Sequence, residues 1–241
     1  MKISIKSTKK TEHHSGSFLI TGRSGAGKST ILGTLPCKPE EVCVIDIENG
    51  LEVLRGQDIQ TIPFWEMEGD PIAKMRECIK FLRESEFKWV GMDSFTMLAE
   101  QIKAHMEHNA AQYGLLTKSG AFDGLKLYGE LKKTYGGIIN AFLALPDKSK
   151  VVICGAEEKA DGPDSRIETL IPGSYSDTIM FNFDEAYGMR VTKTDDGLKR
   201  QFVTNSDGAW VAKSRMSGGS DNALETYENA SIKEVIAKCY S

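Results

Sequence analysis

A short run near the start of the sequence has the residue types and spacing of a phosphate-binding loop. It reads Gly22-Arg23-Ser24-Gly25-Ala26-Gly27-Lys28-Ser29 and is followed by Thr30. The run matches the pattern G-x-x-x-x-G-K-[ST] and comes directly after the apolar residues 18–20. Glycines let successive backbone N–H groups point at one anion, and a helix beginning near Lys28 would direct its positive dipole end there. We therefore expect residues 22–30 to bind ATP, with Lys28 on the β- and γ-phosphates and Ser29 on Mg²⁺.

Acidic residues that follow other apolar runs could complete this chemistry. Asp93 ends the run 89–93, and a carboxylate at the end of a buried strand holds magnesium in proteins with such a loop. Asp46, at the end of the run 42–45, is the competing candidate. Glu48 follows two residues later, where it could orient the water that attacks the γ-phosphate. By position alone, Glu48 fits a solvated loop carboxylate equally well.

The elements that must position these residues alternate along the chain. Short apolar runs at 17–21, 42–47, 88–92 and 150–154 predict buried strands, and helical periodicity predicts helices within 72–82, 95–106 and 127–145. This order predicts an α/β fold with right-handed crossovers, a P-loop NTPase built on a mostly parallel, doubly wound sheet. Strand-like pieces at 185–191, 199–204 and 209–213 predict antiparallel C-terminal hairpins that extend the sheet. Ser231 and Glu234 have capping-box spacing and predict a closing helix.

Composition and charge narrow the class of protein. The net charge of −4 gives no support for a general electrostatic grip on nucleic acid, so DNA contact would need local patches. We expect one domain over residues 17–241 and a basic N-terminal arm over 1–16, which would either contact phosphate or serve as a solubilising tail. No apolar run is long enough to cross a bilayer and no secretory signal is recognisable, so we expect a cytoplasmic protein with no membrane partner. The scattered cysteines and histidines predict neither disulfides nor a zinc site.

The motifs as a set resemble the RecA-like ATPases, in which a D-x-E after the second strand supplies the catalytic glutamate. Asp46-Ile47-Glu48 stands at that place, which favours Glu48 as the catalytic residue. Residues 44–51, with Met92-Asp93-Ser94 and Tyr128-Gly129-Glu130-Leu131, look most like the phage-type ATPases of the fourth Sak class. The resemblance covers about residues 18–222. It implies ATP hydrolysis with Mg²⁺, single-stranded DNA annealing or recombination, and a host-cytoplasmic location if the protein is phage-encoded. It also implies a homo-oligomer, with ring and filament both open, and adds a single-strand binding protein as a candidate partner.

A second resemblance concerns a pair of cations near the C-terminus. The run Ala212-Lys213-Ser214-Arg215 is similar to the K-x-R element of DnaB helicase and KaiC-type proteins, where the two cations reach the nucleotide of a neighbouring subunit. Alternate residues of a strand point the same way, so Lys213 and Arg215 can act on one γ-phosphate and would be catalytic in trans. The alternative is a pair of solvated strand cations.

Glu157 departs from the pattern of the related phage ATPases, and the loops expected to face DNA leave the DNA contact open. Glu157 follows the strand at 151–154, at a position where related phage ATPases carry a polar sensor, and a carboxylate there would repel the γ-phosphate unless it is paired. The loops expected to face DNA are 103–133, with five basic and three acidic residues, and 156–178, with two basic and six acidic residues. The aromatic residues of the first loop, Tyr113, Phe122 and Tyr128, could stack bases or pack in the core.

Two other functions share the same loop. A nucleotide-dependent helicase loader or adaptor would bind ATP and a protein partner without needing turnover. A P-loop small-molecule kinase would need an acceptor pocket and an arginine-rich lid, and no such lid is recognisable in the sequence.

Overall fold

The computed structural model describes residues 16–161, 164–195, 197–217 and 223–240. Among these, ten strands form one sheet, in the order β10-β8-β7-β1-β5-β4-β2-β3, with β6 added to β5 and β9 added to β7. The strands are β1 (Ser17–Gly22), β2 (Val42–Asp46), β3 (Gln60–Pro63), β4 (Trp89–Asp93), β5 (Ser149–Asp161), β6 (Asp164–Thr169), β7 (Glu185–Thr194), β8 (Gly197–Val203), β9 (Lys213–Ser214) and β10 (Tyr227–Asn229). The predicted arm lies almost wholly outside the described residues, so the division at residue 16 stays a prediction.

The pairing of the strands confirms the predicted fold class. Strands β1, β2, β3, β4, β5 and β7 pair in parallel, and β8 and β10 extend the sheet as antiparallel strands. β5 lies between β1 and β4, so the two strands that carry Gly22 and Asp93 are separated by one strand. The carboxyl ends of the parallel strands meet at one edge, where open α/β sheets place their ligands.

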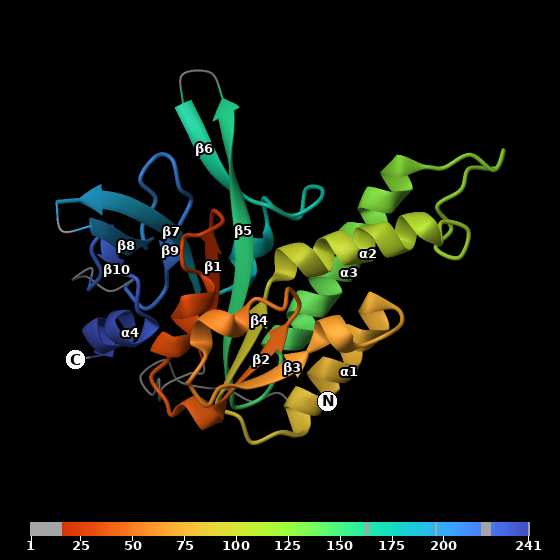
Figure 1. The fold of residues 1–241 in the computed structure, drawn as a ribbon. Helices are drawn as coiled ribbons and strands as arrows, with labels where there is room; N and C mark the ends of the chain where they lie inside the picture. Colours follow the sequence, from red (N-terminus) through yellow and green to blue (C-terminus); the bar gives the residue numbers. More distant parts are fainter. Residues whose placement is uncertain (1–15, 162–163, 196, 218–222, 241) are drawn as a thin grey trace, which may run out of the picture.

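Helices cover both faces of the sheet (Figure 1). They are α1 (Pro71–Glu84), α2 (Phe95–His108), α3 (Gly124–Leu143) and α4 (Ile232–Tyr240), with short 3₁₀ segments η1 (Ser29–Thr34), η2 (Pro39–Glu41), η3 (Leu51–Leu54), η4 (Phe64–Glu66) and η5 (Ile179–Asn182). Alternation along β1 explains the two layers: Leu19 joins the core under α1, α2 and α3, whereas Phe18 and Ile20 join the core under η1 and α4. The predicted helices are therefore present.

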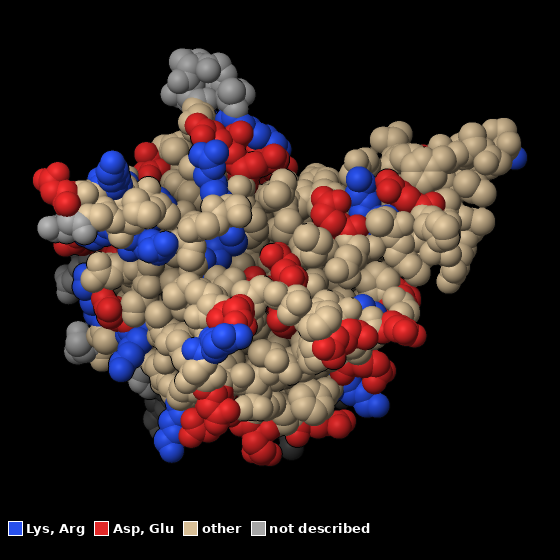
Figure 2. Space-filling model, in the orientation of Figure 1, with Lys and Arg blue, Asp and Glu red and all other residues tan. Residues whose placement is uncertain are grey.

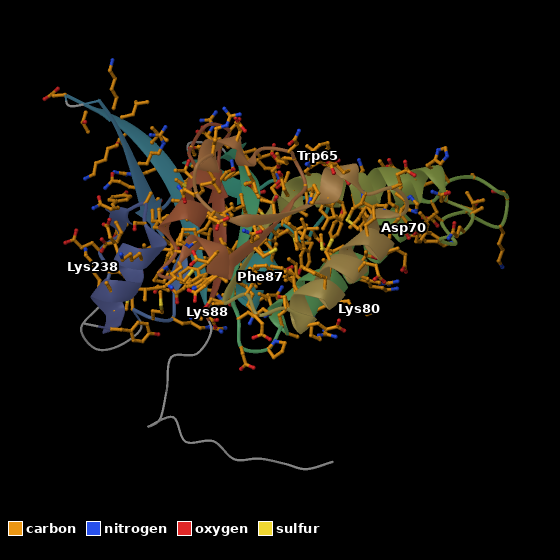
Figure 3. The ribbon with its side chains drawn as sticks, turned by 60° about the horizontal axis from the view of Figure 1, so that its bottom comes forward. Trp65, Asp70, Lys80, Phe87, Lys88 and Lys238 are labelled. Carbon is orange, nitrogen blue, oxygen red and sulfur yellow. The ribbon has the colours of Figure 1, made fainter. Side chains whose placement is uncertain are left out.

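The helices begin at side-chain caps that the sequence shows. Asp70 (Figure 3) accepts from the Ile72 backbone N–H at 2.8 Å at the start of α1, and Asp123 accepts from the Lys126 N–H at 3.2 Å at the start of α3. Ser231 accepts from the Glu234 N–H at 3.3 Å before α4, which is half of the predicted capping box. No described helix has the length and hydrophobicity of a membrane span.

The segment after the phosphate-binding loop differs from the expectation. Instead of a longer α-helix beginning near Lys28, it is the six-residue 3₁₀ helix η1, and Leu35 beyond it is extended with φ −72° and ψ 145°. Pro36 follows, and a residue before proline is disfavoured in the helical region, so the segment must stop there. Because η1 is short, the helix macrodipole that acts on an anion at the loop is weaker than expected.

The chain beyond residue 154 also departs from the predictions. β5 continues to Asp161 and pairs with β6, so much of the predicted loop 156–178 is a projecting hairpin (Figure 1). The strand predicted at 209–213 is wrong, because the strand in this part of the chain is only β9, Lys213–Ser214, and Trp210 makes no more than an isolated bridge to Ile167. Asp207 accepts from the Ala209 and Trp210 N–H groups and turns the chain, and Trp210 is buried instead against Gly188 of β7.

Candidate functional site

The predicted phosphate, metal and catalytic residues meet at the carboxyl edge of the sheet. Gly22 at the end of β1 is in register with Gly155 of β5, and Asp46 is in register with Asp93. A cleft of about 540 Å³ opens there. Of the predicted residues it is lined by Ser24, Gly25, Gly27, Lys28, Ser29, Thr30, Glu48 and Asp93. Segments that are far apart in the sequence thus share one site, of a size that suits a small ligand.

The phosphate-binding loop needs glycine at specific positions. Gly25 and Gly27 have φ of 76° and 94°, where an L side chain is strained. A Cβ on Gly22 would lie 3.0 Å from the Met189 Cβ, so this glycine allows β7 to pack close to the loop. Ala26 is buried beneath the loop, and its N–H donates to the Arg23 carbonyl at 3.2 Å. The Lys28 ammonium donates to the same carbonyl at 3.0 Å, so it lies over the loop it is expected to serve.

The donor set fits a magnesium ion. The Ser29 hydroxyl hydrogen-bonds to the Asp93 carboxylate, and both supply hard oxygen ligands. Asp93 is 4% exposed, and burial raises its pKa to about 6, with the Ser29 hydrogen bond opposing the shift and the Glu48 and Asp46 charges adding to it. A buried carboxyl in this electrostatic setting suits a cation. No group of three or more His, Cys, Asp or Glu residues that could hold a metal occurs in the described part of the chain. The remaining ligands would come from phosphate and water.

Asp46, the competing acid, has a different use. Its Oδ1 accepts from the Gly50 N–H at 3.3 Å, closing the turn that follows β2. Burial raises the pKa of Asp46, while backbone N–H groups of that turn act in the opposite sense. It does not line the cleft, so Asp93 remains the predicted metal-side acid.

Glu48 is held by a residue that the sequence did not single out. The carboxylate is exposed in the cleft, and its Oε1 accepts from the hydroxyl of Ser94. Ser94 is buried, and the same hydroxyl accepts from the Met97 N–H at 3.3 Å as the cap of α2. A serine before a predicted helix signals a cap. Nothing in the sequence signals that it also contacts a carboxylate 46 residues away.

Thr96 is a second residue of the site that sequence reasoning missed. Its hydroxyl accepts from the Gly155 N–H at 2.8 Å and donates to the Leu170 carbonyl at 2.8 Å. One side chain in the cleft therefore ties the start of α2 to Gly155 of β5 and to Leu170, the residue that follows β6. Arg200 of β8 also lines the cleft and was likewise not anticipated.

The cation pair lies at the other end of the sheet. Lys213 is in register with Ala186 and Ser214 with Glu185, both at the amino end of β7. The Arg215 guanidinium donates to Asp184 at 2.8 Å, and the other oxygen of Asp184 accepts from Ser17. Ser17 begins β1 and Gly22 ends it, a separation of about 17 Å at strand spacing. The pair is therefore placed away from the loop of its own chain, and a role in trans stays a prediction.

Glu157 does not take up the expected sensor position. Gly155 and Ala156 of β5 line the cleft, whereas Glu157 does not. The Lys159 ammonium lies 3.8 Å from the Glu157 carboxylate and 2.7 Å from that of Glu168. Because the Glu157 carboxylate lies near Lys159 and outside the cleft, it would not repel a γ-phosphate bound there.

Comparisons with known proteins give one family and a set of similar solved structures, of which two are described here. A family model described as an AAA domain matches residues 15–216. No curated protein matches the sequence. A KaiC-like protein from the hyperthermophilic archaeon Pyrococcus horikoshii is 13% identical, with 78% of each chain covered and a TM-score of 0.48. The flagellar accessory protein FlaH from Methanocaldococcus jannaschii is 14% identical, with 89% of this chain and 84% of that chain covered and a TM-score of 0.46.

Proposed function

The chain belongs to the AAA domain family, and from this premise we propose that it hydrolyses ATP and acts on single-stranded DNA in phage-type recombination or annealing. Its fold is that of a RecA-like P-loop ATPase. The single observation that carries hydrolysis is the meeting of Lys28, Ser29, Asp93 and Glu48 in one cleft. The finer assignment, to ATPases of the fourth Sak class, rests on the sequence resemblance.

Each residue has a distinct part in this proposal. The loop amides and the Lys28 ammonium bind the phosphates. Ser29 and Asp93 would hold Mg²⁺, which would offset the negative charge of the transferring phosphoryl group. Glu48 accepts a hydrogen bond from the attacking water and orients it toward the γ-phosphate. Ser94 restrains the Glu48 carboxylate, since its hydroxyl is fixed as the cap of α2.

Glu48→Gln tests this assignment. The variant should keep its affinity for ATP and lose turnover by about 10²-fold or more, because an amide cannot serve as the base. Glu52→Gln is the matched control, since Glu52 is an exposed carboxylate nearby that pairs with Arg55 outside the cleft. Unchanged turnover in Glu48→Gln would refute the role of Glu48. Tight ATP binding without turnover in the unaltered protein would favour the adaptor function instead.

We assign Lys213 and Arg215 to the nucleotide of a neighbouring subunit in a homo-oligomer. The support is their position, about one strand length from their own loop. Arg215→Ala should bind ATP normally and lose about 10³-fold in turnover. Mixing Arg215→Ala with Lys28→Ala should restore activity, because one chain keeps the loop and the other keeps the cations. If the arginine served only its ion pair with Asp184, the mixture would stay inactive.

The DNA contact is proposed for residues 103–133. Ion pairs join Lys103 to Glu107, Lys126 to Asp123 and Lys133 to Glu130. The net excess of positive charge in this stretch is therefore left at Lys118 and Lys132. Charges of both signs are interspersed over the face seen in Figure 2, so a local contact fits better than a broad basic surface.

Exposed aromatic rings in this stretch could stack on bases. Phe122 is 49% exposed and Tyr128 is 47% exposed, whereas Tyr113 packs against His105 with ring centroids 5.8 Å apart. Phe122→Ala should weaken single-stranded DNA binding by at least about 5-fold, and Tyr113→Phe should not. Size-resolved ATPase assays with and without single-stranded DNA would test oligomerisation and DNA coupling together. Turnover that is independent of both DNA and protein concentration would contradict the proposal.

A further inference from the structure

The hairpin formed by β7 and β8 stands beside the phosphate-binding loop. β1 ends at Gly22, which is in register with Met189, and β7 continues from there to Thr194. β8 returns antiparallel along β7, with Arg200 opposite Val191. Cross-strand partners share a face, so Arg200 lies on the same face as Val191, beyond the Met189 and Phe202 pair in the core under η1. This face borders the loop.

Arg200 lies against the backbone of the loop itself. A Cβ built on Gly27 would be 2.9 Å from both Cδ and Nε of Arg200. Gly27 immediately precedes Lys28, and both line the cleft with Arg200. The guanidinium is therefore next to the amides that are expected to hold the phosphates. Arg200 can come this close to the loop because Gly27 has no side chain.

The charge of Arg200 is not used within the described fold. Arg23, Arg55 and Arg215 each form an ion pair with a carboxylate, and Arg190 lies over an aromatic ring at 3.5 Å from its centroid. Arg200 is exposed and makes no ion pair with any described residue. An arginine offers five donors in a planar fork that suits phosphate oxygens.

The cleft has a need for a second cation. The described residues that line it include two carboxylates, Glu48 and Asp93. Apart from Arg200, the cation among those lining residues is Lys28. The helix that normally supports the anion is here the short segment η1, so its dipole contributes less. We propose that Arg200 is a nucleotide-binding residue that acts in cis, donating hydrogen bonds to the phosphates held by its own loop. This role rests on the proposed ATP site and is separate from that of Arg215, which is directed at a neighbouring subunit.

Nucleotide affinity tests the assignment without depending on turnover. The dissociation constants of Mg²⁺-ATP and of inorganic tripolyphosphate would be measured by calorimetry or by competition with a fluorescent nucleotide. Arg200→Ala should weaken both by about 10-fold or more, the usual effect of losing hydrogen bonds to a charged group. Arg200→Lys, which keeps the charge but not the fork, should recover part of the affinity.

Lys199→Ala is the matched control. Lys199 is the preceding residue of β8 and is also exposed, but it points to the opposite face and faces Thr192 across the hairpin. The Lys199→Ala substitution removes a charge of the same sign from the same strand and should change the ATP affinity by about 2-fold or less. Equal losses in Arg200→Ala and Lys199→Ala would reduce the effect to net charge and overturn the proposal.

The outcomes separate this inference from the proposed function. If the unaltered protein does not bind Mg²⁺-ATP, the ATP site itself is refuted. If the unaltered protein and Arg200→Ala bind ATP equally tightly, the site stands and the role of Arg200 is overturned. Unfolding midpoints without nucleotide should be the same for both, since Arg200 is exposed, whereas the midpoint rise caused by ATP should be smaller for Arg200→Ala. Loss of ATP affinity with unchanged tripolyphosphate affinity would overturn the assignment to phosphate.

Discussion

Replacing Ser94 by alanine tests whether its hydroxyl positions the Glu48 carboxylate for turnover or only stabilises the fold as a helix cap. The hydroxyl has two partners, the Glu48 carboxylate and the Met97 N–H at 3.3 Å. Loss of the helix cap costs about 1 kcal/mol of unfolding free energy. Glu48 is exposed, so water replaces the lost partner and adds little to that cost. The protein should therefore remain folded.

Turnover should fall far more than stability. Without the Ser94 hydroxyl the Glu48 carboxylate can rotate away from the attacking water, and a misplacement of about 1 Å can cost up to about 10²-fold in rate. We expect kcat for ATP in Ser94→Ala to fall about 10- to 100-fold while the dissociation constant of ATP changes little. Phosphate release at saturating Mg²⁺-ATP, equilibrium ATP binding and urea unfolding would be measured on the same preparation.

Asp70→Ala is the matched control for lost capping. Asp70 caps α1 through the Ile72 N–H at 2.8 Å, so its removal should cost a similar free energy, and it does not line the cleft. Its kcat should equal that of the unaltered protein. The reasoning is refuted if Ser94→Ala keeps full kcat, or if Asp70→Ala loses as much.

Two further predictions concern Gly188, within β7, and Asp184, the residue before β7. A Cβ on Gly188 would lie 2.4 Å from Trp210 Cε3, so Gly188→Ala should lose about 1–3 kcal/mol in urea unfolding, and adding Trp210→Ala should cost less than the sum of the single changes; additive costs would show that the two residues are not in conflict. Burial acts to raise the pKa of Asp184, but hydrogen bonds from Ser17 and Arg215 outweigh it and hold the pKa below the ordinary 3.8. A lowered pKa stabilises the fold above the ordinary value and ceases to do so as the pH falls through the folded-state pKa. Asp184→Asn should therefore cost about 1 kcal/mol at pH 7, after allowance for solvent screening, and less below about pH 4; a cost that grows on acidification would refute the assignment.

The parts of the site that lie in one short stretch could be predicted from the sequence. The loop 22–29 binds through consecutive backbone amides, so its glycine spacing carries the chemistry without reference to the rest of the chain. Asp93 and Asp46 were found because a buried parallel strand reads as an apolar run and its end as a polar residue. The same local patterns predicted the mostly parallel sheet and the four helices.

Tertiary structure decided which side chains face the cleft and which residues far apart in the sequence touch. Gly155 and Ala156 line the site and the next residue, Glu157, does not, an outcome that the local sequence pattern did not predict. Ser94 reaches Glu48 because β2 and β4 end at one edge, and Arg200 reaches Gly27 because β8 returns along β7 beside the loop. No local pattern encodes either relation. The distance of Lys213 and Arg215 from their own loop likewise follows from the pairing of β9 with the amino end of β7, which depends on the register of the assembled sheet.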